Sequence, residues 1–326
     1  QAEDGIRDSV ASRGLGDVYK RQMHDDIYGI KKWGNDILEI LENGNIGLKN
    51  PFQPDNSPAD LIKIIKSLNE RGISCPVLLR VTDYLAFRIK QINNSFFRAI
   101  REIRYKGEYK GVFPVKVNQQ AQVIDRIVEF GKEFDFGLEV GSKPELLIAL
   151  AHDLSANSAI ICNGIKDREF IHLAILSIKI GFKTILVLES PRELDLIIKI
   201  SKELNVRPLL GIRVKLTNKV SGNWSQSSGD RSAFGLSVEQ VMEVINKLKI
   251  YDYLDCLILQ HSHLGSQIPD IIEIRKATQE ACRFFSEMSK LGAPLTYLDL
   301  GGGLGVDYTG EQKSAFNSIN LSLIHI

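Results

Sequence analysis

Seven short apolar runs alternate with helical patterns along most of the chain, and this alternation limits the possible fold more than any other feature. The apolar runs are expected strands at residues 111–117, 134–140, 159–163, 183–189, 208–214, 254–260 and 295–300. The helical patterns between them lie at residues 120–131, 143–153, 167–180, 191–205, 237–249 and 271–291. Strands that alternate with helices indicate a parallel α/β fold, and the absence of a GxGxxG motif after the first strand disfavours a dinucleotide-binding fold. We therefore expect a (β/α)8 TIM barrel that lacks its last strand.

The part of the chain before these strands has mixed signals. Residues 59–71 have the apolar spacing of a helix, residues 76–81 resemble a strand, and residues 84–105 resemble a long helix. We expect an N-terminal segment over residues 23–75 and an incomplete barrel over residues 76–320.

Three of the expected helices have a marked start. Each begins at a serine that is followed three positions later by glutamate or glutamine, and these serines are Ser142, Ser190 and Ser237. The spacing predicts a capping box, in which the two side chains bind backbone N–H groups that the first helical turn leaves free.

Both ends of the chain look foreign to the protein. Residues 17–22 can be encoded by GATGTGTATAAGAGACAG and residues 321–326 by CTGTCTCTTATACACATC. The two strings are reverse complements of each other and resemble a transposon end used in sequencing adapters. We therefore interpret residues 1–22 and 321–326 as adapter-derived tails and leave them out of the expected fold. The alternative is a polar N-terminal tail and a short apolar C-terminus.

The composition is that of an ordinary globular protein, with 44% hydrophobic and 25% charged residues. The formal net charge of +1 indicates neither nucleic acid nor an acidic membrane surface as a partner. No apolar run approaches the roughly 20 residues of a membrane-spanning helix, and no signal-peptide pattern is present. The four cysteines are scattered without a CxxC pair, which predicts reduced thiols in a cytoplasmic protein rather than disulfides or zinc ligands.

Lys116 is the one charged residue in the otherwise apolar run 111–117. We expect such a strand to be buried on both faces, where a lysine is costly unless it is paired or used in chemistry. A lysine withdrawn from water loses its proton more readily, and the neutral amine forms a Schiff base with an aldehyde. The alternative is a lysine that extends from the end of the strand into water.

Polar groups recur where the other expected strands end, which is where barrel active sites lie. They are Glu139, Asn163, Glu189, Arg213, His261 with His263, and Gly301-Gly302-Gly303. Core packing does not predict such a ring. Each member also has a structural alternative: an ion pair for Glu139 or Arg213, a turn for Asn163, and a buried core position for a histidine.

The three glycines follow the seventh strand, and barrels often bind phosphate at the loops after strands seven and eight. Glycines allow backbone N–H groups to close on an anion, although a flexible turn is the alternative. A lysine and a phosphate loop in one barrel suggest pyridoxal phosphate, with its aldehyde on Lys116 and with His263 flat against its ring.

Seven segments of the chain resemble the biosynthetic arginine decarboxylase family, whose relatives are the ornithine and diaminopimelate decarboxylases with an alanine-racemase-like barrel. The segments are residues 111–120, 134–147, 161–169, 207–214, 228–236, 261–270 and 297–310, and the resemblance covers nearly all of residues 23–320. The motifs HSHLGSQIPD and LDLGGGLGVDY look like the arginine branch rather than the ornithine branch.

The resemblance implies roles for individual residues. Lys116 would hold pyridoxal phosphate as an internal aldimine, and His263 would stack on the ring. Glu139 and Arg213 would line the cofactor, and Ser266 with Gly301, Gly302 and Gly303 would serve its phosphate. Substrate would lie beside Leu298, Asp299, Leu300, Gly301, Gly302, Gly303, Leu304, Gly305, Val306, Asp307 and Tyr308.

The implied activity is decarboxylation of L-arginine to agmatine and carbon dioxide, which feeds putrescine and spermidine synthesis. The resemblance also implies a homo-oligomer and an association with magnesium, although no ligand cluster in the sequence argues for the metal. Alternatives are a decarboxylase of ornithine or diaminopimelate, and a non-catalytic carrier of pyridoxal phosphate.

The chain departs from the family pattern in two ways. Ala233 stands where relatives usually have lysine before Phe-Gly. The family's acidic partner of the pyridine nitrogen, its cysteine proton donor and its C-terminal β domain would lie beyond Asn320. We therefore expect the chain as given to be inactive.

Overall fold

The computed structural model describes residues 27–30, 34, 37–217, 234–268 and 270–306. These residues form two compact units that divide between Phe87 and Arg88, each with a sheet of its own. The domain boundaries that we expect from the sequence, at residues 22, 75 and 320, stay predictions.

The N-terminal unit has a small antiparallel sheet of β1 (Leu38–Ile40), β2 (Ile46–Leu48) and β3 (Ala59–Asp60). Asp60 ends β3 and caps α3 (Leu61–Glu70), because its carboxylate accepts hydrogen bonds from the first backbone N–H groups of that helix. The strand expected at residues 76–81 is wrong: these residues have no strand assignment, and Leu78 is 71% exposed. An apolar run does not become a strand without a neighbouring strand to pair with. Helix α4 (Thr82–Glu102) follows, close to the long helix expected there.

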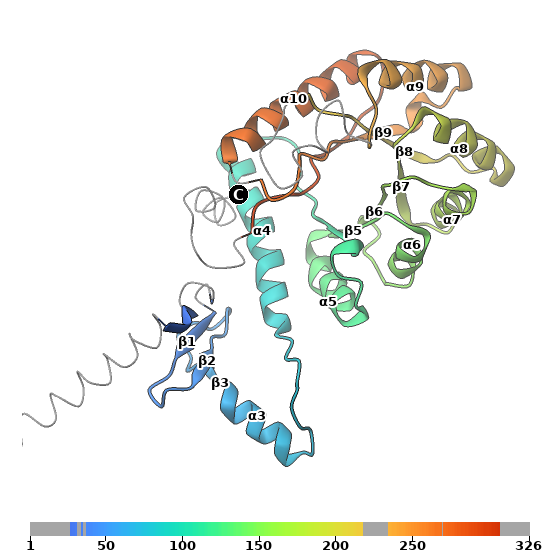
Figure 1. Cartoon of the computed structure of the whole chain (residues 1–326). Helices are drawn as coiled ribbons and strands as arrows, with labels where there is room; N and C mark the ends of the chain where they lie inside the picture. Colours follow the sequence, from blue (N-terminus) through green and yellow to red (C-terminus); the bar gives the residue numbers. More distant parts are fainter. Residues whose placement is uncertain (1–26, 31–33, 35–36, 218–233, 269, 307–326) are drawn as a thin grey trace, which may run out of the picture. The chain divides into compact units, whose positions relative to one another are not determined.

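The C-terminal unit holds a seven-stranded parallel sheet in which each strand pairs with its neighbours in chain order (Figure 1). The strands are β4 (Val112–Pro114), β5 (Gly137–Val140), β6 (Ala159–Cys162), β7 (Lys183–Leu188), β8 (Leu209–Arg213), β9 (Leu257–His261) and β10 (Tyr297–Asp299). The outer strands of this described sheet are β4 and β10. The expected parallel α/β barrel, incomplete at seven strands, is confirmed.

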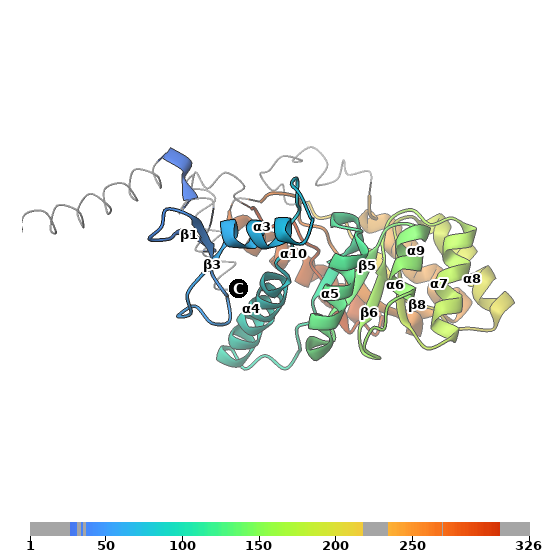
Figure 2. The same cartoon turned by 90° about the horizontal axis from the view of Figure 1, so that it is seen from below.

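A helix follows each of the first six strands, and together these helices cover the outer face of the sheet (Figures 1 and 2). They are α5 (Ala121–Gly131), α6 (Lys143–Leu150), α7 (Arg168–Lys179), α8 (Pro191–Leu204), α9 (Val238–Tyr251) and α10 (Ile271–Lys290). All six were expected from the hydrophobic periodicity, with ends that differ by a few residues.

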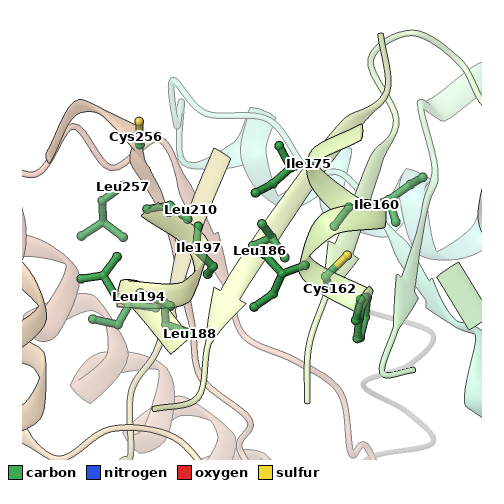
Figure 3. Close-up of a cluster of buried hydrophobic side chains, with 14 of the residues drawn as sticks. Ile160, Cys162, Ile175, Leu186, Leu188, Leu194, Ile197, Leu210, Cys256 and Leu257 are labelled. Atoms are coloured by element: carbon green, nitrogen blue, oxygen red, sulfur yellow. The ribbon is translucent and has the colours of Figure 1, made fainter. Parts of the chain in front are cut away.

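Successive side chains of a strand point to opposite faces, and the two faces of the sheet form separate apolar clusters. Figure 3 shows the outer cluster, in which Leu186 of β7 packs among helix side chains such as Ile175 of α7 and Ile197 of α8. The inner cluster contains Ile161, Ile185, Val187 and Leu259. Residues two positions beyond members of the inner cluster continue the inner face past the apolar layer, and these include Asn163, Glu189 and His261.

The helix starts differ in part from the expected capping boxes. The box at Ser237 is confirmed, with both side chains bound to backbone N–H groups. At Ser142 and Ser190 the serine caps its helix, but the glutamate reaches one residue further back. Glu145 accepts from the N–H of Gly141 at 2.7 Å, and Glu193 from the N–H of Glu189 at 2.8 Å. Each glutamate therefore fixes the backbone just after the preceding strand by a hydrogen bond.

All four cysteines are free in the structure, with Cys162 and Cys256 buried and Cys75 and Cys282 exposed. Among the residues that the structure describes, no helix is long and apolar enough to cross a membrane.

Candidate active site

Lys116 lies two residues beyond β4, in a single 3-10 turn formed by residues Val115–Val117. The prediction of a lysine buried inside a strand was wrong, because its side chain is 62% exposed. The ladder of β4 ends with the pair Pro114–Glu139, and β4 is an outer strand, so the residues that follow leave the sheet. The amine of Lys116 is therefore open to solvent at the C-terminal edge of the sheet.

Glu139 connects Lys116 to the next strand of the sheet. Its Oε2 lies 3.7 Å from Nζ of Lys116, and its Oε1 accepts a hydrogen bond from Nδ2 of Asn163 at 3.2 Å. The Glu139 side chain is only 11% exposed, so its charge is balanced by these two neighbours rather than by bulk water. The structure thus brings together three members of the expected ring.

Glu189 and Arg213 form a second group on the inner face. Nη1 of Arg213 donates to Oε1 of Glu189 at 2.7 Å, and the two side chains are 17% and 2% exposed. The guanidinium carbon also lies 5.2 Å from the ring centroid of Phe234. The structural alternative for Arg213, an ion pair, is therefore present, and its role toward a cofactor stays a prediction.

His261 and Asp299 form a third group, which joins neighbouring strands. Nδ1 of His261 lies 2.8 Å from Oδ2 of Asp299, and Oδ1 of Asp299 accepts from the N–H of Gly301 at 2.8 Å. Burial raises the pKa of Asp299, but the charge and hydrogen bond of His261 outweigh burial, so the pKa lies below its ordinary value. The sequence did not predict this pair, because only the parallel pairing of β9 with β10 sets Asp299 opposite His261.

His263 lies two residues after His261 and has an open side. Burial of the rest of its ring, and then the charges of His261, Arg213 and Lys116, lower its pKa to about 4 from the ordinary 6.5. The imidazole is therefore neutral at neutral pH. A neutral, partly open ring fits the expectation that His263 stacks on a flat aromatic group.

The glycine loop after β10 packs backbone against backbone on the loop after β9. Gly303 has φ +97°, and a Cβ there would lie 1.8 Å from the carbonyl oxygen of Gly265, so no other residue fits. Gly301 has φ +68°, and its Cβ would lie 2.9 Å from Nδ1 of His263. Gly302 has open space around it, with no heavy atom within 4 Å of such a Cβ. Ser266 lies in the facing loop and is half-buried.

The segment expected to bind substrate, residues 298–308, lies only in part beside these groups. Leu298 and Leu300 pack against the apolar cluster that contains Leu264 and Ile268. Leu304 and Gly305 pair with Ile268 through the backbone, and Val306 is 45% exposed. Asp307, Tyr308 and also Ala233 lie outside the described residues. The substrate roles stay predictions.

The residues present fit pyridoxal phosphate. Lys116 offers an exposed amine, His263 a neutral ring, and Gly302 an open backbone position suited to an anion. Magnesium has no comparable support, because the described residues contain no group of three or more His, Cys, Asp or Glu that could hold a metal ion.

Comparison with known proteins identifies the family. Residues 89–325 match the family model described as pyridoxal-dependent decarboxylase, pyridoxal binding domain. The biosynthetic arginine decarboxylase of Prochlorococcus marinus (strain MIT 9312) is 47% identical over 296 residues, which are 91% of this chain and 46% of that protein. The protein of the same name from Gloeobacter violaceus is 44% identical over 298 residues, with the same coverage. The chain spans about half the length of the curated relatives it matches.

Solved structures give the same result. The crystal structure of the biosynthetic arginine decarboxylase from Campylobacter jejuni superposes with a TM-score of 0.80 at 34% identity, covering 91% of this chain and 47% of that one. A diaminopimelate decarboxylase structure (TM-score 0.67, 22% identity, 89% of this chain and 63% of that one) shares the fold. Because the family model matches well over half of the residues, the chain belongs to the pyridoxal-dependent decarboxylases and carries their pyridoxal-binding domain.

Proposed function

We propose that the protein containing this chain decarboxylates L-arginine to agmatine and carbon dioxide with pyridoxal phosphate. The observation that carries the proposal is the 47% identity to a biosynthetic arginine decarboxylase over 91% of the chain. The segments HSHLGSQIPD and LDLGGGLGVDY, which look like the arginine branch, include His263 and the three glycines.

Bound pyridoxal phosphate supplies an aldehyde and a ring that withdraws electrons from the α-carbon of an amino acid. Nζ of Lys116 must lose a proton before it can act as a nucleophile toward an aldehyde. Oε2 of Glu139, at 3.7 Å, is the carboxylate oxygen next to this amine and is held in place by Asn163. Lys116 and Glu139 therefore form the pair that we expect to attach the cofactor.

The remaining groups would orient the cofactor that Lys116 holds. The neutral ring of His263 offers a flat surface, and the open space at Gly302 leaves room for a phosphate beside the backbone. The Arg213 guanidinium adds a fixed positive charge on the same inner face. A cytoplasmic location, a homo-oligomer, magnesium dependence and delivery of agmatine to putrescine and spermidine synthesis stay predictions from the resemblance.

We expect the activity from the full-length protein and not from these 326 residues alone. A barrel closes only when its last strand pairs with its first, and each outer strand of the described sheet, β4 and β10, has a single neighbour. The 326-residue chain and the full-length protein, expressed side by side, give the comparison. Agmatine formation by the short chain would contradict this expectation.

The decisive test is product analysis with the purified full-length protein and pyridoxal phosphate. L-arginine, L-ornithine and diaminopimelate are supplied separately, and amine products are identified by mass spectrometry. We expect agmatine from arginine, with a kcat/KM at least roughly a hundredfold above that for the other two. Putrescine or lysine as the main product would favour the other diamino acid decarboxylases. Cofactor binding without carbon dioxide from any of the three would favour a carrier.

A further inference from the structure

The carboxylate of Glu189 accepts hydrogen bonds from three segments that are far apart in the sequence. Its Oε1 accepts from the N–H of Gly164 at 3.0 Å and from Nη1 of Arg213 at 2.7 Å. Its Oε2 accepts from the N–H of Gly235 at 3.0 Å. Because the side chain is 2% exposed, these three donors replace water around a buried charge. One carboxylate thus joins the loop after β6, the end of β8 and the segment before α9.

A second layer of contacts fixes Glu189 itself. Glu193, in the first turn of α8, accepts from the N–H of Glu189 at 2.8 Å and from the N–H of Lys166 at 2.9 Å. The fully buried ammonium of Lys166 donates to the carbonyl oxygens of Gly164 and Val187 and lies 3.5 Å from Glu193. Burial lowers the pKa of Lys166, and the two glutamates oppose this effect. The backbone at Glu189 and the loop at residues 164–166 are therefore held by hydrogen bonds.

Arg213 is the part of this network that faces the site. Glu189 binds its guanidinium on one side, and the Phe234 ring lies 5.2 Å from it on another. Gly235 (φ +85°) leaves room for the arginine, because a Cβ there would lie 3.2 Å from Cγ of Arg213. The register of the sheet sets Arg213 opposite His261 of β9. A shift of the Glu189 carboxylate would therefore move a charge that lies close to the histidines.

We propose that Glu189 is a positioning residue, which acts on the bound cofactor through Arg213. This inference rests on the proposed function, because it requires Arg213 to line the pyridoxal phosphate site. The competing explanation is a buried ion pair that only stabilises the fold. The two explanations differ in what removal of the carboxylate does to cofactor affinity.

The test measures pyridoxal phosphate affinity by absorbance and fluorescence titration of the full-length apoprotein. In Glu189→Gln the amide offers one acceptor oxygen to three donors and turns an N–H₂ group toward the rest. We expect the Kd for pyridoxal phosphate to rise roughly ten- to a hundredfold, which is the scale of losing a hydrogen bond to a charged group. Glu203→Gln is the matched control, because Glu203 pairs with Arg168 at 2.8 Å on the surface, and its Kd should stay within about twofold of wild type.

A double-mutant cycle then separates positioning from stability. In an Arg213→Met background, Glu189→Gln should change the Kd by much less than in the wild type, because both substitutions act through the same guanidinium. An unchanged Kd in Glu189→Gln alongside a lower unfolding temperature would overturn the proposal. Equal effects of Glu189→Gln in both backgrounds would also overturn it.

Two features keep the test informative. If Glu189→Gln does not fold, Glu189→Asp keeps the charge and withdraws the carboxylate by one methylene, and an unchanged Kd in that variant would overturn the proposal. The titration needs no turnover of arginine. A wild-type protein that binds pyridoxal phosphate but leaves arginine intact would therefore contradict the proposed function while this test still gives its answer.

Discussion

The polar groups at the ends of β6, β7 and β8 are enclosed by the chain itself, whereas Lys116 beyond the outer strand β4 is open to water. Glu189, at the centre of the sheet, is 2% exposed and accepts three hydrogen bonds. Lys116 is 62% exposed, and its ion pair with Glu139 is 3.7 Å long. Both residues lie at the C-terminal edge of the sheet, but they differ in solvent exposure and in the number of polar partners.

The difference follows from the number of neighbours that each strand has. A central strand has a strand on each side and a helix layer behind it, so its end groups meet fixed partners. An outer strand has such partners on one side only. The central groups are therefore positioned by neighbours on both sides, whereas in the described sheet the strand before Lys116 has such a neighbour on one side only.

The largest expected effect comes from the accessible group. In the full-length protein, Lys116→Ala should lower kcat for arginine by roughly a thousandfold or more, as expected for loss of an essential nucleophile. Lys132→Ala is the control, because Lys132 is an exposed lysine that pairs with Asp153 on the surface. Steady-state agmatine formation is the measurement. Near-normal turnover by Lys116→Ala would show that Lys116 is not the essential nucleophile.

The next effect concerns the core that supports the central strands. Leu186 of β7 is fully buried in the outer cluster, so Leu186→Ala should lower the free energy of unfolding by about 2–5 kcal/mol. Leu147→Ala, at a side chain that is 57% exposed on α6, should change it by no more than about 0.5 kcal/mol. Urea unfolding followed by circular dichroism gives both values. Equal losses would mean that the centre of the sheet is not the rigid region.

A smaller effect should separate the two histidines. His263→Ala removes a neutral ring with an open side, and we expect the Kd for pyridoxal phosphate to rise about three- to tenfold with little change in unfolding temperature. His261→Ala leaves Asp299 without its 2.8 Å partner, so its main effect should be a lower unfolding temperature. Cofactor titration and thermal unfolding of both variants test this assignment. A higher Kd in His261→Ala and a lower unfolding temperature in His263→Ala would mean that His261 contacts the cofactor and His263 stabilises the fold.

The smallest effect is a pH dependence. Since the pKa of His263 is lowered to about 4 in the folded protein, the unfolded chain takes up this proton near pH 6.5 and the folded chain only near pH 4. Stability from this residue is therefore lost as the pH falls from about 6.5 toward 4. NMR titration of the histidine ring protons in the cofactor-free protein measures the pKa directly, with His263→Gln used to assign the signal. A pKa at or above the ordinary 6.5 would contradict the proposed surroundings of the ring.

The seven strands and the six helices could be predicted because they depend on local periodicity. The surroundings of Lys116 could not, because apolar residues on both sides of a lysine do not tell how many strands flank it. The strand expected at residues 76–81 was wrong for the same reason, since no described strand pairs with this run. A local sequence pattern indicates which face of a strand or helix is apolar. It does not indicate which strand will pair with that segment.

The contacts of Glu189 were also beyond the reach of the sequence. Its donors lie 25, 24 and 46 residues away, at Gly164, Arg213 and Gly235. The ring of strand ends was visible as a list of polar residues, but the pairing within it depends on register and on two glycine turns with positive φ. The signal in the sequence was a glutamate at the end of an apolar run.

The most direct test of the central claim is reduction of the full-length, cofactor-loaded protein with borohydride, followed by digestion and mass spectrometry of the labelled peptide. Two lysines near the site are compared: Lys116, which is 62% exposed, and Lys166, whose side chain is fully buried and held by the chain. We predict that the pyridoxyl group is found on Lys116 and not on Lys166. A label on Lys166, or on any lysine other than Lys116, would contradict the account.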